Sequence, residues 1–399
     1  MTKLNHLNYY RLPWNLADNA IAWLEPTAKC NLACYGCYRQ NQSEGHKSLD
    51  QIKEDLDVFQ KFRKFDAVSI AGGDPLVHPE IVEIVRLIKE LGAKPIVNTN
   101  ALALTPELLR ELKRAGVFGF TFHIDSKQNR PGWKDSNEIE LNELRYRYAR
   151  MLADAGGMVC SFNSTVYEDT AKFVPDLARW AERNIDIVQV MVFILYRAID
   201  TRKHDFYVGG NKLDASTFVY NDEPEVRTDI KAEEVYDMLR SEDPAFDSCA
   251  YLNGTEQPDS FKWLLSGRFG TKEKIYGYMG PKGMELIQTI NHLVLGTYLG
   301  YASPRTGRMG KTMLLLGAFD RKVRSAFKAF YSSPRNLFKR LHYQSVMIIQ
   351  PIDLLEDGRQ NMCDSCPDIT VWNGQLVWSC RMDEQLKFGC NMASLPKRS

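Results

Sequence analysis

The feature that most constrains the fold is a regular alternation of short apolar runs and amphipathic helical stretches between residues 20 and 195. Such alternation predicts an α/β fold with a parallel sheet, because each helix returns the chain to start the next strand in the same direction. Six strands are too few to close an eight-stranded barrel. Five helices are expected between the strands, and a sixth helix is expected after residue 230. The expected strands cover residues 21–24, 67–71, 95–97, 119–124, 158–166 and 185–194.

A loop directly after the first apolar run carries three closely spaced thiols, Cys30, Cys34 and Cys37. Cysteine thiolates are the preferred ligands of iron–sulfur clusters, and three of them leave one iron of a cubane without a protein ligand. A structural zinc ion takes four protein ligands, and no nearby residue completes that set. Three unrelated core thiols would have to meet by chance within eight residues. We therefore interpret the loop as the site of an iron–sulfur cluster.

A second motif, Gly72-Gly73-Asp74-Pro75, ends the next predicted strand. Two glycines allow a close approach of the backbone, and a proline fixes the turn. Taken alone, these four residues are only a turn signal. Their position, about one strand–helix unit after the cysteine loop, is what makes them specific.

Together, the two motifs resemble those of the radical S-adenosylmethionine (SAM) enzymes, whose signatures are CxxxCxxC and a strand-terminal GGEP, here with Asp74 in place of Glu. The resemblance implies an open, partial (β/α)6 TIM-like barrel with a C-terminal helical and cysteine-rich extension. It also implies a [4Fe–4S] cluster on the three cysteines and SAM at the open iron. In this family the second motif receives the methionine ammonium of SAM.

The cysteine loop departs from the family at the residue before the third cysteine, which is usually aromatic and seats the adenine of SAM. Here that residue is Gly36, preceded by Tyr35. Glycine at this position is similar to the adenosylhopane synthase branch, whose members add the adenosyl radical to a lipid. Tyr35 and Gly36 are the residues that the resemblance implies near the adenine.

Polar residues stand where several predicted strands end. In α/β barrels ligands bind at the carboxyl ends of the strands. The resemblance implies that these side chains hold the carboxylate and ribose of SAM. Loop and helix-capping duty, which Asn and Asp often perform, is the alternative. The residues are Asn98, Asn100, His123, Asp125 and Asn163.

Four further cysteines, Cys363, Cys366, Cys380 and Cys390, lie near the C-terminus. Asn373-Gly374 between apolar segments predicts a hairpin that returns Cys380 toward the first two thiols. Spacing alone does not separate zinc from a cluster. The region resembles the SPASM and twitch extensions of radical SAM enzymes, which implies one auxiliary [4Fe–4S] cluster. Structural zinc and unligated thiols are the alternatives.

Residues 281–342 hold eleven Lys and Arg but only two acids, a net charge of +9 within a chain of net charge +1. A basic helical surface with interleaved Phe and Leu suits a membrane interface or an anionic lipid. A solvated basic face over an ordinary core is the other interpretation. The uncharged run 286–304 is too polar to cross a membrane. The near-neutral total argues against nucleic acid as a partner.

The chain is expected to divide into four parts. These are an N-terminal extension (1–18), the partial barrel (19–200), an insertion or lid followed by the basic helical region (201–345), and the cysteine-rich domain (346–399). Grouped cysteines without a signal-peptide pattern predict a cytoplasmic protein, with membrane association left open.

The resemblance predicts an enzyme that takes an electron from a flavodoxin- or ferredoxin-like donor and cleaves SAM to a 5′-deoxyadenosyl radical. That radical would modify an unactivated carbon of a small-molecule substrate. The glycine variant of the loop and the basic segment favour a lipid-like or other amphiphilic substrate. Two alternatives are a SPASM-type maturase of a ribosomally made peptide or protein, and a non-catalytic electron carrier.

Overall fold

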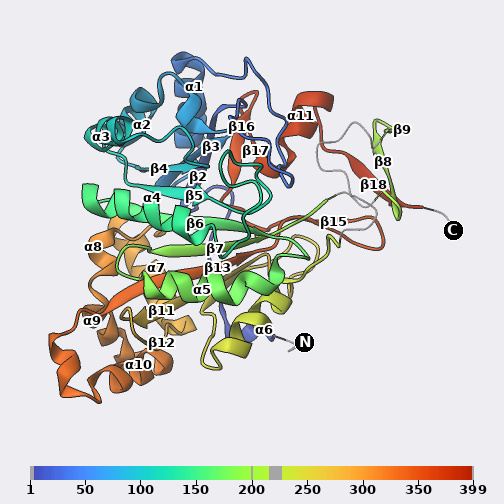
Figure 1. Ribbon diagram of the computed structural model, residues 1–399. Helices are drawn as coiled ribbons and strands as arrows, with labels where there is room; N and C mark the ends of the chain where they lie inside the picture. The colour runs from blue at the N-terminus through green and yellow to red at the C-terminus, as the bar shows by residue number, and fades with distance from the viewer. Residues whose placement is uncertain (1–3, 199–200, 215–226, 398–399) are drawn as a thin grey trace.

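The computed structural model describes residues 4–198, 201–214 and 227–397. Six parallel strands neighbour one another in chain order, as the alternation predicts, and helices cross between them (Figure 1). The sheet stays open at the first strand, which gives a partial TIM-like barrel. The strands are β2 (Ile21–Thr27), β3 (Ala67–Gly72), β4 (Lys94–Thr99), β5 (Gly119–His123), β6 (Val159–Val166) and β7 (Val190–Leu195), and the helices are α1 (Leu49–Phe62), α2 (Ile81–Glu90), α3 (Pro106–Ala115), α4 (Asn142–Ala155) and α5 (Val174–Arg183).

Local signals set the helix ends. The Thr105 hydroxyl accepts a hydrogen bond from Leu108 N, Pro106 opens α3, and Gly116 ends it with φ of 99°. Ser48 and Gln51 form a reciprocal capping box at the start of α1. These ends therefore follow from the sequence alone.

The sheet continues beyond β7, which the alternation does not predict. Strand β13 (His342–Ile349) pairs parallel with β7, and β11 (Trp263–Gly270) pairs antiparallel with β13. Antiparallel neighbours need no crossover helix, so they leave no alternation to detect. The sheet has eleven strands, completed by β10 (Ala250–Leu252), β1 (Tyr10–Arg11) and β12 (Ile275–Tyr278).

Much of the segment expected as an insertion or lid thus extends the sheet. The boundary expected at 345 falls inside β13, and β1 of the expected N-terminal extension pairs with β10. Helix α6 (Ala232–Glu242) is the helix expected after residue 230, and it contacts α5 and β13.

The C-terminal hairpin forms as predicted from β16 (Ile369–Trp372) and β17 (Gln375–Trp378), with positive φ at Asn373 and Gly374. It lies against β2 and α1. The remaining strands are β14 (Asp353–Leu354), which pairs with β15 (Gln360–Asn361), and the small sheet of β8 (His204–Val208), β9 (Asn211–Lys212) and β18 (Ala393–Pro396).

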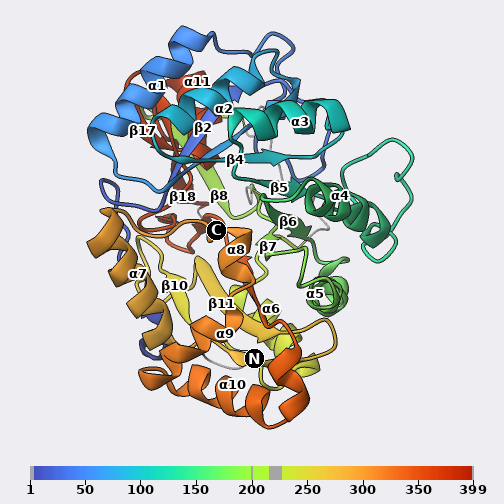
Figure 2. The ribbon, with the colours of Figure 1, turned by 90° about the vertical axis from the view of Figure 1, so that its left-hand side faces the viewer.

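The other helices are shorter or lie outside the barrel. Helices α7 (Pro281–Leu295), α8 (Pro304–Gly307), α9 (Gly310–Met313) and α10 (Arg321–Tyr331) lie together on the face turned to the viewer in Figure 2. Helix α11 (Met382–Phe388) follows the hairpin, and the 3-10 turns are η1 (His6–Asn8), η2 (Pro75–Val77), η3 (Ala171–Phe173), η5 (Leu314–Ala318), η6 (Pro334–Phe338) and η7 (Ser379–Arg381).

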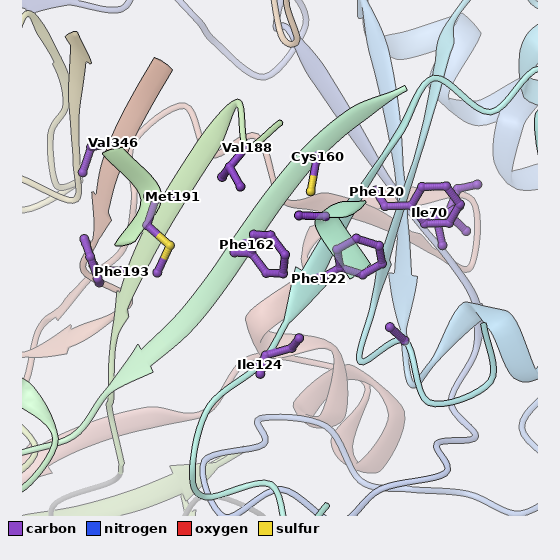
Figure 3. Packing of buried hydrophobic residues seen from close by; sticks show 14 of the residues in the cluster. Ile70, Phe120, Phe122, Ile124, Cys160, Phe162, Val188, Met191, Phe193 and Val346 are labelled. Atoms are coloured by element: carbon purple, nitrogen blue, oxygen red, sulfur yellow. The ribbon is translucent and has the colours of Figure 1, made fainter. Parts of the chain in front are cut away.

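The main core fills the space between the parallel strands and helices α1–α5 (Figure 3). Phe120 and Phe122 stack with ring centroids 5.6 Å apart, and the Phe162 and Trp180 rings meet edge to face at 5.4 Å. Cys160 is buried in this core and Cys249 in a second apolar cluster, and burial raises the pKa of Cys249 to about 12. Both are therefore core thiols, as their isolated positions predict.

Candidate active site

A cavity of about 350 Å³ lies at the carboxyl ends of the parallel strands. The barrel supplies one wall, and residues after β13 supply the other. Members of both predicted cysteine sets line this one cavity, although more than 300 residues separate the two sets. The cysteines that line it are Cys30, Cys34, Cys37, Cys363, Cys366 and Cys380.

Hydrogen bonds to the rest of the chain hold the N-terminal cysteine loop. The Asn41 side chain accepts from Cys30 N at 2.9 Å and donates to Cys30 O at 3.0 Å. Tyr35 N donates to Lys127 O at 2.9 Å, which ties the loop to the segment after β5. The loop is therefore positioned by backbone contacts that leave its three thiols facing the cavity.

The three thiols suit a metal cluster. Burial raises the pKa of Cys30, Cys34 and Cys37, and the neighbouring thiols raise the pKa of Cys34 further. Free thiols here would stay neutral, so bound metal ions are what would make them thiolates. Among the described residues, no three His, Cys, Asp or Glu side chains are arranged around a single metal ion. A cubane cluster is larger and spreads its ligands more widely than one ion does.

The two glycines of the second motif approach the chain itself. A Cβ at Gly73 would lie 2.1 Å from Lys29 O, and one at Gly72 would lie 2.4 Å from Thr27 O. Gly73 N and Asp74 N donate to Thr27 O and Lys29 O at 2.8 and 2.9 Å. The motif therefore docks against the backbone that leads into the cysteine loop, and side chains at these positions would separate the two.

Asp74 links the ends of β3 and β4. Its buried carboxylate accepts hydrogen bonds from Thr99 Oγ1 at 2.7 and 2.9 Å and from Asn100 N at 2.8 Å. Burial raises its pKa, while these hydrogen bonds oppose the shift. Asn100 in turn places its amide nitrogen 3.7 Å from Cys30 Sγ. Asp74 thus positions a residue that contacts the cysteine loop.

The structure brings the predicted strand-end residues together. Within the group, His123 Nε2 lies 3.0 Å from Asp125 Oδ2 and 2.9 Å from Thr165 Oγ1. Although burial opposes it, the His123 contact holds the pKa of Asp125 below its usual value. Tyr35 and Pro75, which were also predicted, are not among the residues that line the cavity. The predicted residues that line the cavity are Gly36, Gly72, Gly73, Asp74, Asn98, Asn100, His123, Asp125 and Asn163.

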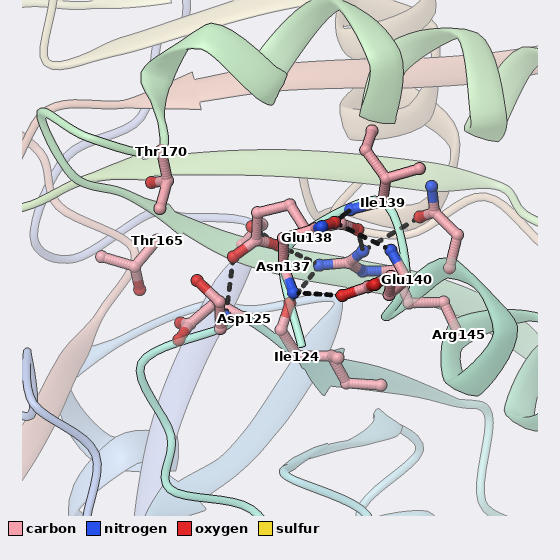
Figure 4. Close-up of polar contacts among 12 residues, drawn as sticks. Ile124, Asp125, Asn137, Glu138, Ile139, Glu140, Arg145, Thr165 and Thr170 are labelled. Carbon is pink, nitrogen blue, oxygen red and sulfur yellow. Dashed lines mark hydrogen bonds and ion pairs between the residues drawn. The ribbon is translucent and has the colours of Figure 1, made fainter. Parts of the chain in front are cut away.

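A buried ion pair braces the loop that carries Asp125 (Figure 4). Arg145 donates to Glu138 Oε2 at 2.5 Å and to Ile124 O at 2.7 Å. Glu138 Oε1 accepts from Ser126 N at 2.7 Å. The pair therefore fixes the residues on both sides of Asp125. Sequence reasoning missed it, because a charged residue in a helix normally faces solvent.

Tyr167 occupies the space beside Gly36. A Cβ at Gly36 would lie 2.5 Å from Tyr167 Oη and 3.1 Å from a ring carbon of Tyr196. The Tyr167 and Tyr196 ring centroids are 5.0 Å apart, and Lys127 Nζ lies 4.7 Å from the Tyr167 ring centroid. The loop glycine is thus matched by an aromatic surface from the ends of β6 and β7. Sequence reasoning missed both tyrosines, although Tyr167 directly follows one predicted strand and Tyr196 lies two residues after the end of another.

The C-terminal thiols form a second group. A hydrogen bond to Cys363 and burial raise the pKa of Cys366, and burial followed by the charge of Cys366 raises that of Cys380. These three thiols are therefore neighbours, as the hairpin predicts. Cys390 follows the end of α11, is exposed, and does not line the cavity. Of the four predicted C-terminal ligands, three therefore line the cavity and Cys390 does not.

Asp368 lies at the base of the hairpin between these thiols. Its carbonyl accepts from Ser379 N at 3.0 Å, which places it beside Cys380, and Asp368 is one of the residues that line the cavity. Burial raises the pKa of Asp368 to about 7, against the charge of Arg63. Within the described ranges no group donates a hydrogen bond to its carboxylate. Sequence reasoning missed Asp368, because only the fold brings it near the thiols.

Arg39 joins the two walls of the cavity. Its buried guanidinium contacts Glu25 Oε2 at 3.0 Å on β2 and Asp383 Oδ1 at 2.8 Å on α11. Ser379 Oγ donates to Glu25 Oε1 at 2.5 Å. These contacts hold the C-terminal segment against the cysteine loop.

A second buried ion network lies beside the cavity. Asp353 Oδ1 accepts from Arg197 at 3.0 Å, and Asp353 Oδ2 accepts from Lys262 Nζ at 2.6 Å. Although burial opposes it, the two cations lower the pKa of Asp353 to about 2. Burial lowers the pKa of Lys262 to about 8 despite its carboxylate partner. At neutral pH all three groups are therefore charged, and the one carboxylate serves two cations.

An open α/β barrel that gathers a CxxxCxxC loop and a glycine-rich motif at its carboxyl ends defines a radical SAM domain, and residues 24–181 match the model of the Radical SAM superfamily. This chain therefore contains a radical SAM domain.

Its relatives include the tungsten-containing aldehyde ferredoxin oxidoreductase cofactor-modifying protein of Pyrococcus furiosus, 36% identical over 26% of this chain and 30% of the relative. The AdoMet-dependent heme synthase of Methanosarcina barkeri is 35% identical over 27% of this chain and 32% of the relative. The chain spans about a third of the length of these two curated relatives. Among solved structures, Streptococcus suis SuiB bound to S-adenosylmethionine has 13% identity and a TM-score of 0.41, covering 57% of this chain and 47% of that chain.

Proposed function

We propose that this protein is a radical SAM enzyme whose substrate binds between two cysteine sites in one cavity. The observation that supports this most is that the cysteine loop, the glycine-rich motif and the strand-end polar residues all line the cavity that Cys363, Cys366 and Cys380 also line. An electron carrier would have no use for such a chamber beside its cluster.

Cys30, Cys34 and Cys37 would hold the [4Fe–4S] cluster. When bound, the cluster and SAM supply one-electron cleavage of SAM to methionine and a 5′-deoxyadenosyl radical. The chain's own residues would position SAM and the substrate and exclude water from the cavity. Asn100 is held by Asp74 beside Cys30, and His123 with Asp125 offers polar groups on the same wall. Tyr167 and Tyr196 cover the cysteine loop.

We propose that the C-terminal site holds an auxiliary [4Fe–4S] cluster on Cys363, Cys366 and Cys380. Asp368 is the candidate for the fourth position, because it lines the cavity together with these three cysteines. Cys390 is not a ligand in this proposal. A flavodoxin- or ferredoxin-like donor would supply electrons, and clusters sensitive to oxygen would keep the enzyme in the cytoplasm.

The substrate proposed is a lipid-like or other amphiphilic small molecule with an apolar body. The cavity wall away from the cysteine loop is largely apolar, and the nearby cation Arg197 is already paired with Asp353. The basic segment lies elsewhere, as described below, so it does not support this choice. The apolar side chains of that wall are Trp23, Ile194, Phe206, Trp263, Ile349, Ile352, Leu354, Met362, Trp378 and Met392.

The proposal is tested by anaerobic reconstitution with iron and sulfide, followed by dithionite and SAM. We expect 5′-deoxyadenosine from the wild type and from Cys390→Ser, and none from Cys34→Ala. Product from Cys34→Ala, or none from the wild type, contradicts the proposal. Stimulation of product formation by a precursor peptide rather than by amphiphiles would favour a peptide maturase instead.

A further inference from the structure

Exposed large apolar side chains are concentrated in one stretch of the chain. Among the described residues, twenty large hydrophobic side chains are exposed, and ten of them lie between residues 290 and 338. Phe338 is 93% exposed and Leu293 is 78% exposed. A soluble surface rarely gathers such residues. We name these ten the basic–apolar surface: Ile290, Leu293, Val294, Leu295, Met309, Leu315, Phe319, Phe327, Leu337 and Phe338.

These residues are the outer sides of helices whose inner sides are buried. On α10, Val323, Ala326 and Phe330 face the second core, while Phe327 faces outward. On α7, Met284 and Gln288 are buried, while the last turn has no core to cover it. The exposure therefore belongs to the fold rather than to frayed ends.

The same region carries unpaired positive charge. One of its two acids, Asp320, is buried and caps α10 by accepting from Lys322 N and Val323 N. Lys322 and Lys339 form ion pairs with Asp247 and Glu273. Nine other cations make no ion pair with any residue in the described part of the chain, and two of them, Lys311 and Arg324, donate to backbone carbonyls instead. The remaining seven are Lys282, Arg305, Arg308, Arg321, Lys328, Arg335 and Arg340.

The basic–apolar surface lies at the opposite end of the sheet from the cavity. Gly310 N donates to Leu341 O at 3.1 Å, just before β13 begins. Lys94 Nζ donates to Tyr301 O at 2.9 Å, at the amino end of β4. Figures 1 and 2 show α7, α8, α9 and α10 on this side. Strands of six to eight residues put about 20 Å between the two ends.

We propose that the basic–apolar surface docks the protein on an anionic lipid bilayer. Exposed Leu and Phe side chains enter the headgroup region while Arg and Lys contact lipid phosphates. Nucleic acid would use the charges but leave the apolar side chains in water. No helix in the described ranges is long and apolar enough to cross a membrane, so the contact is peripheral. The bilayer then lies away from the cavity.

The full-length protein is sedimented with phosphatidylcholine vesicles and with vesicles that also contain phosphatidylglycerol. We expect binding to the anionic vesicles alone, weakened by salt. Leu293→Ser with Phe338→Ser should lower the partition coefficient at least about tenfold. The matched control is Leu7→Ser with Leu395→Ser, since Leu7 is also 78% exposed but lies outside the surface.

A second pair of variants guards against misfolding. Arg335→Gln with Arg340→Gln should weaken binding, whereas Arg110→Gln on α3 should not. Equal binding to both vesicle types, no binding to either, or unchanged binding by the surface variants overturns the proposal. Formation of 5′-deoxyadenosine does not depend on docking, so the two proposals fail separately.

Discussion

Gly36 and Tyr167 share one space: a Cβ on the glycine would lie 2.5 Å from the tyrosine hydroxyl oxygen. The glycine in the cysteine loop is therefore one half of a pair, and the other half comes from the end of β6, 131 positions later. The space beside this glycine is filled by an aromatic ring that follows the end of β6.

Replacing Gly36 with Ala should therefore disturb the loop and its neighbour together. We expect a loss of about 1 to 3 kcal/mol in stability, because an added methyl overpacks a closed site. Tyr167→Phe removes the contacting oxygen, so the double variant should recover part of the loss. Urea unfolding and SAM binding measured on all four proteins would check this. If the double variant recovers no stability, the contact between Gly36 and Tyr167 is not the cause of the loss.

The C-terminal thiols should respond unequally to substitution. In a background lacking Cys30, Cys34 and Cys37, Cys390→Ser should keep the iron content while Cys380→Ser should lose it. Asp368→Asn should change the electron paramagnetic resonance spectrum of the reduced cluster without removing iron. Equal iron loss in Cys390→Ser and Cys380→Ser would restore Cys390 as a ligand. One zinc ion per chain in place of iron would contradict the proposal of an auxiliary cluster.

Asp353 should make the free energy of unfolding depend on pH in the acid range. Its pKa of about 2 lies below the unfolded value of about 3.9, so it contributes stability above pH 4 that is lost as the pH falls toward 2. Asp353→Asn should cost about 3 to 5 kcal/mol at pH 7, because Lys262 and Arg197 stay buried without a counter-charge. Urea unfolding from pH 7 to pH 2 should show the difference from wild type shrinking. A constant difference would contradict this.

Asp74→Asn tests whether the carboxylate positions Asn100. The amide nitrogen cannot accept from Asn100 N or from Thr99, so Asn100 should move away from Cys30. We expect SAM affinity to fall about tenfold, a loss near 1.4 kcal/mol for one charged hydrogen bond. Equilibrium dialysis of the reconstituted protein measures it. Glu107→Gln, an exposed carboxylate on α3, is the control.

The parts of the fold that local patterns encode could be predicted. The strands β2–β7, the caps of α3 and the Asn373-Gly374 hairpin each follow from neighbouring residues. Strands β1, β10, β11 and β13 could not be predicted as one sheet. The pairs β1–β10 and β7–β13 join segments far apart in the chain, and β11 pairs antiparallel with its neighbours. The first cysteine loop needs only its own spacing. Tyr167, Asp368 and the Glu138–Arg145 pair act across the fold, so no local pattern marks them.

The Arg39 bridge holds together two cavity walls that are synthesised at different times. The cavity wall that it secures, residues 363–392, is synthesised more than 300 residues after the cysteine loop. Until that segment is synthesised, the carboxyl end of the barrel has no covering wall and is exposed to water and to any oxidant. A chain halted before residue 363 would therefore have one complete cysteine loop and no chamber in which to contain a radical.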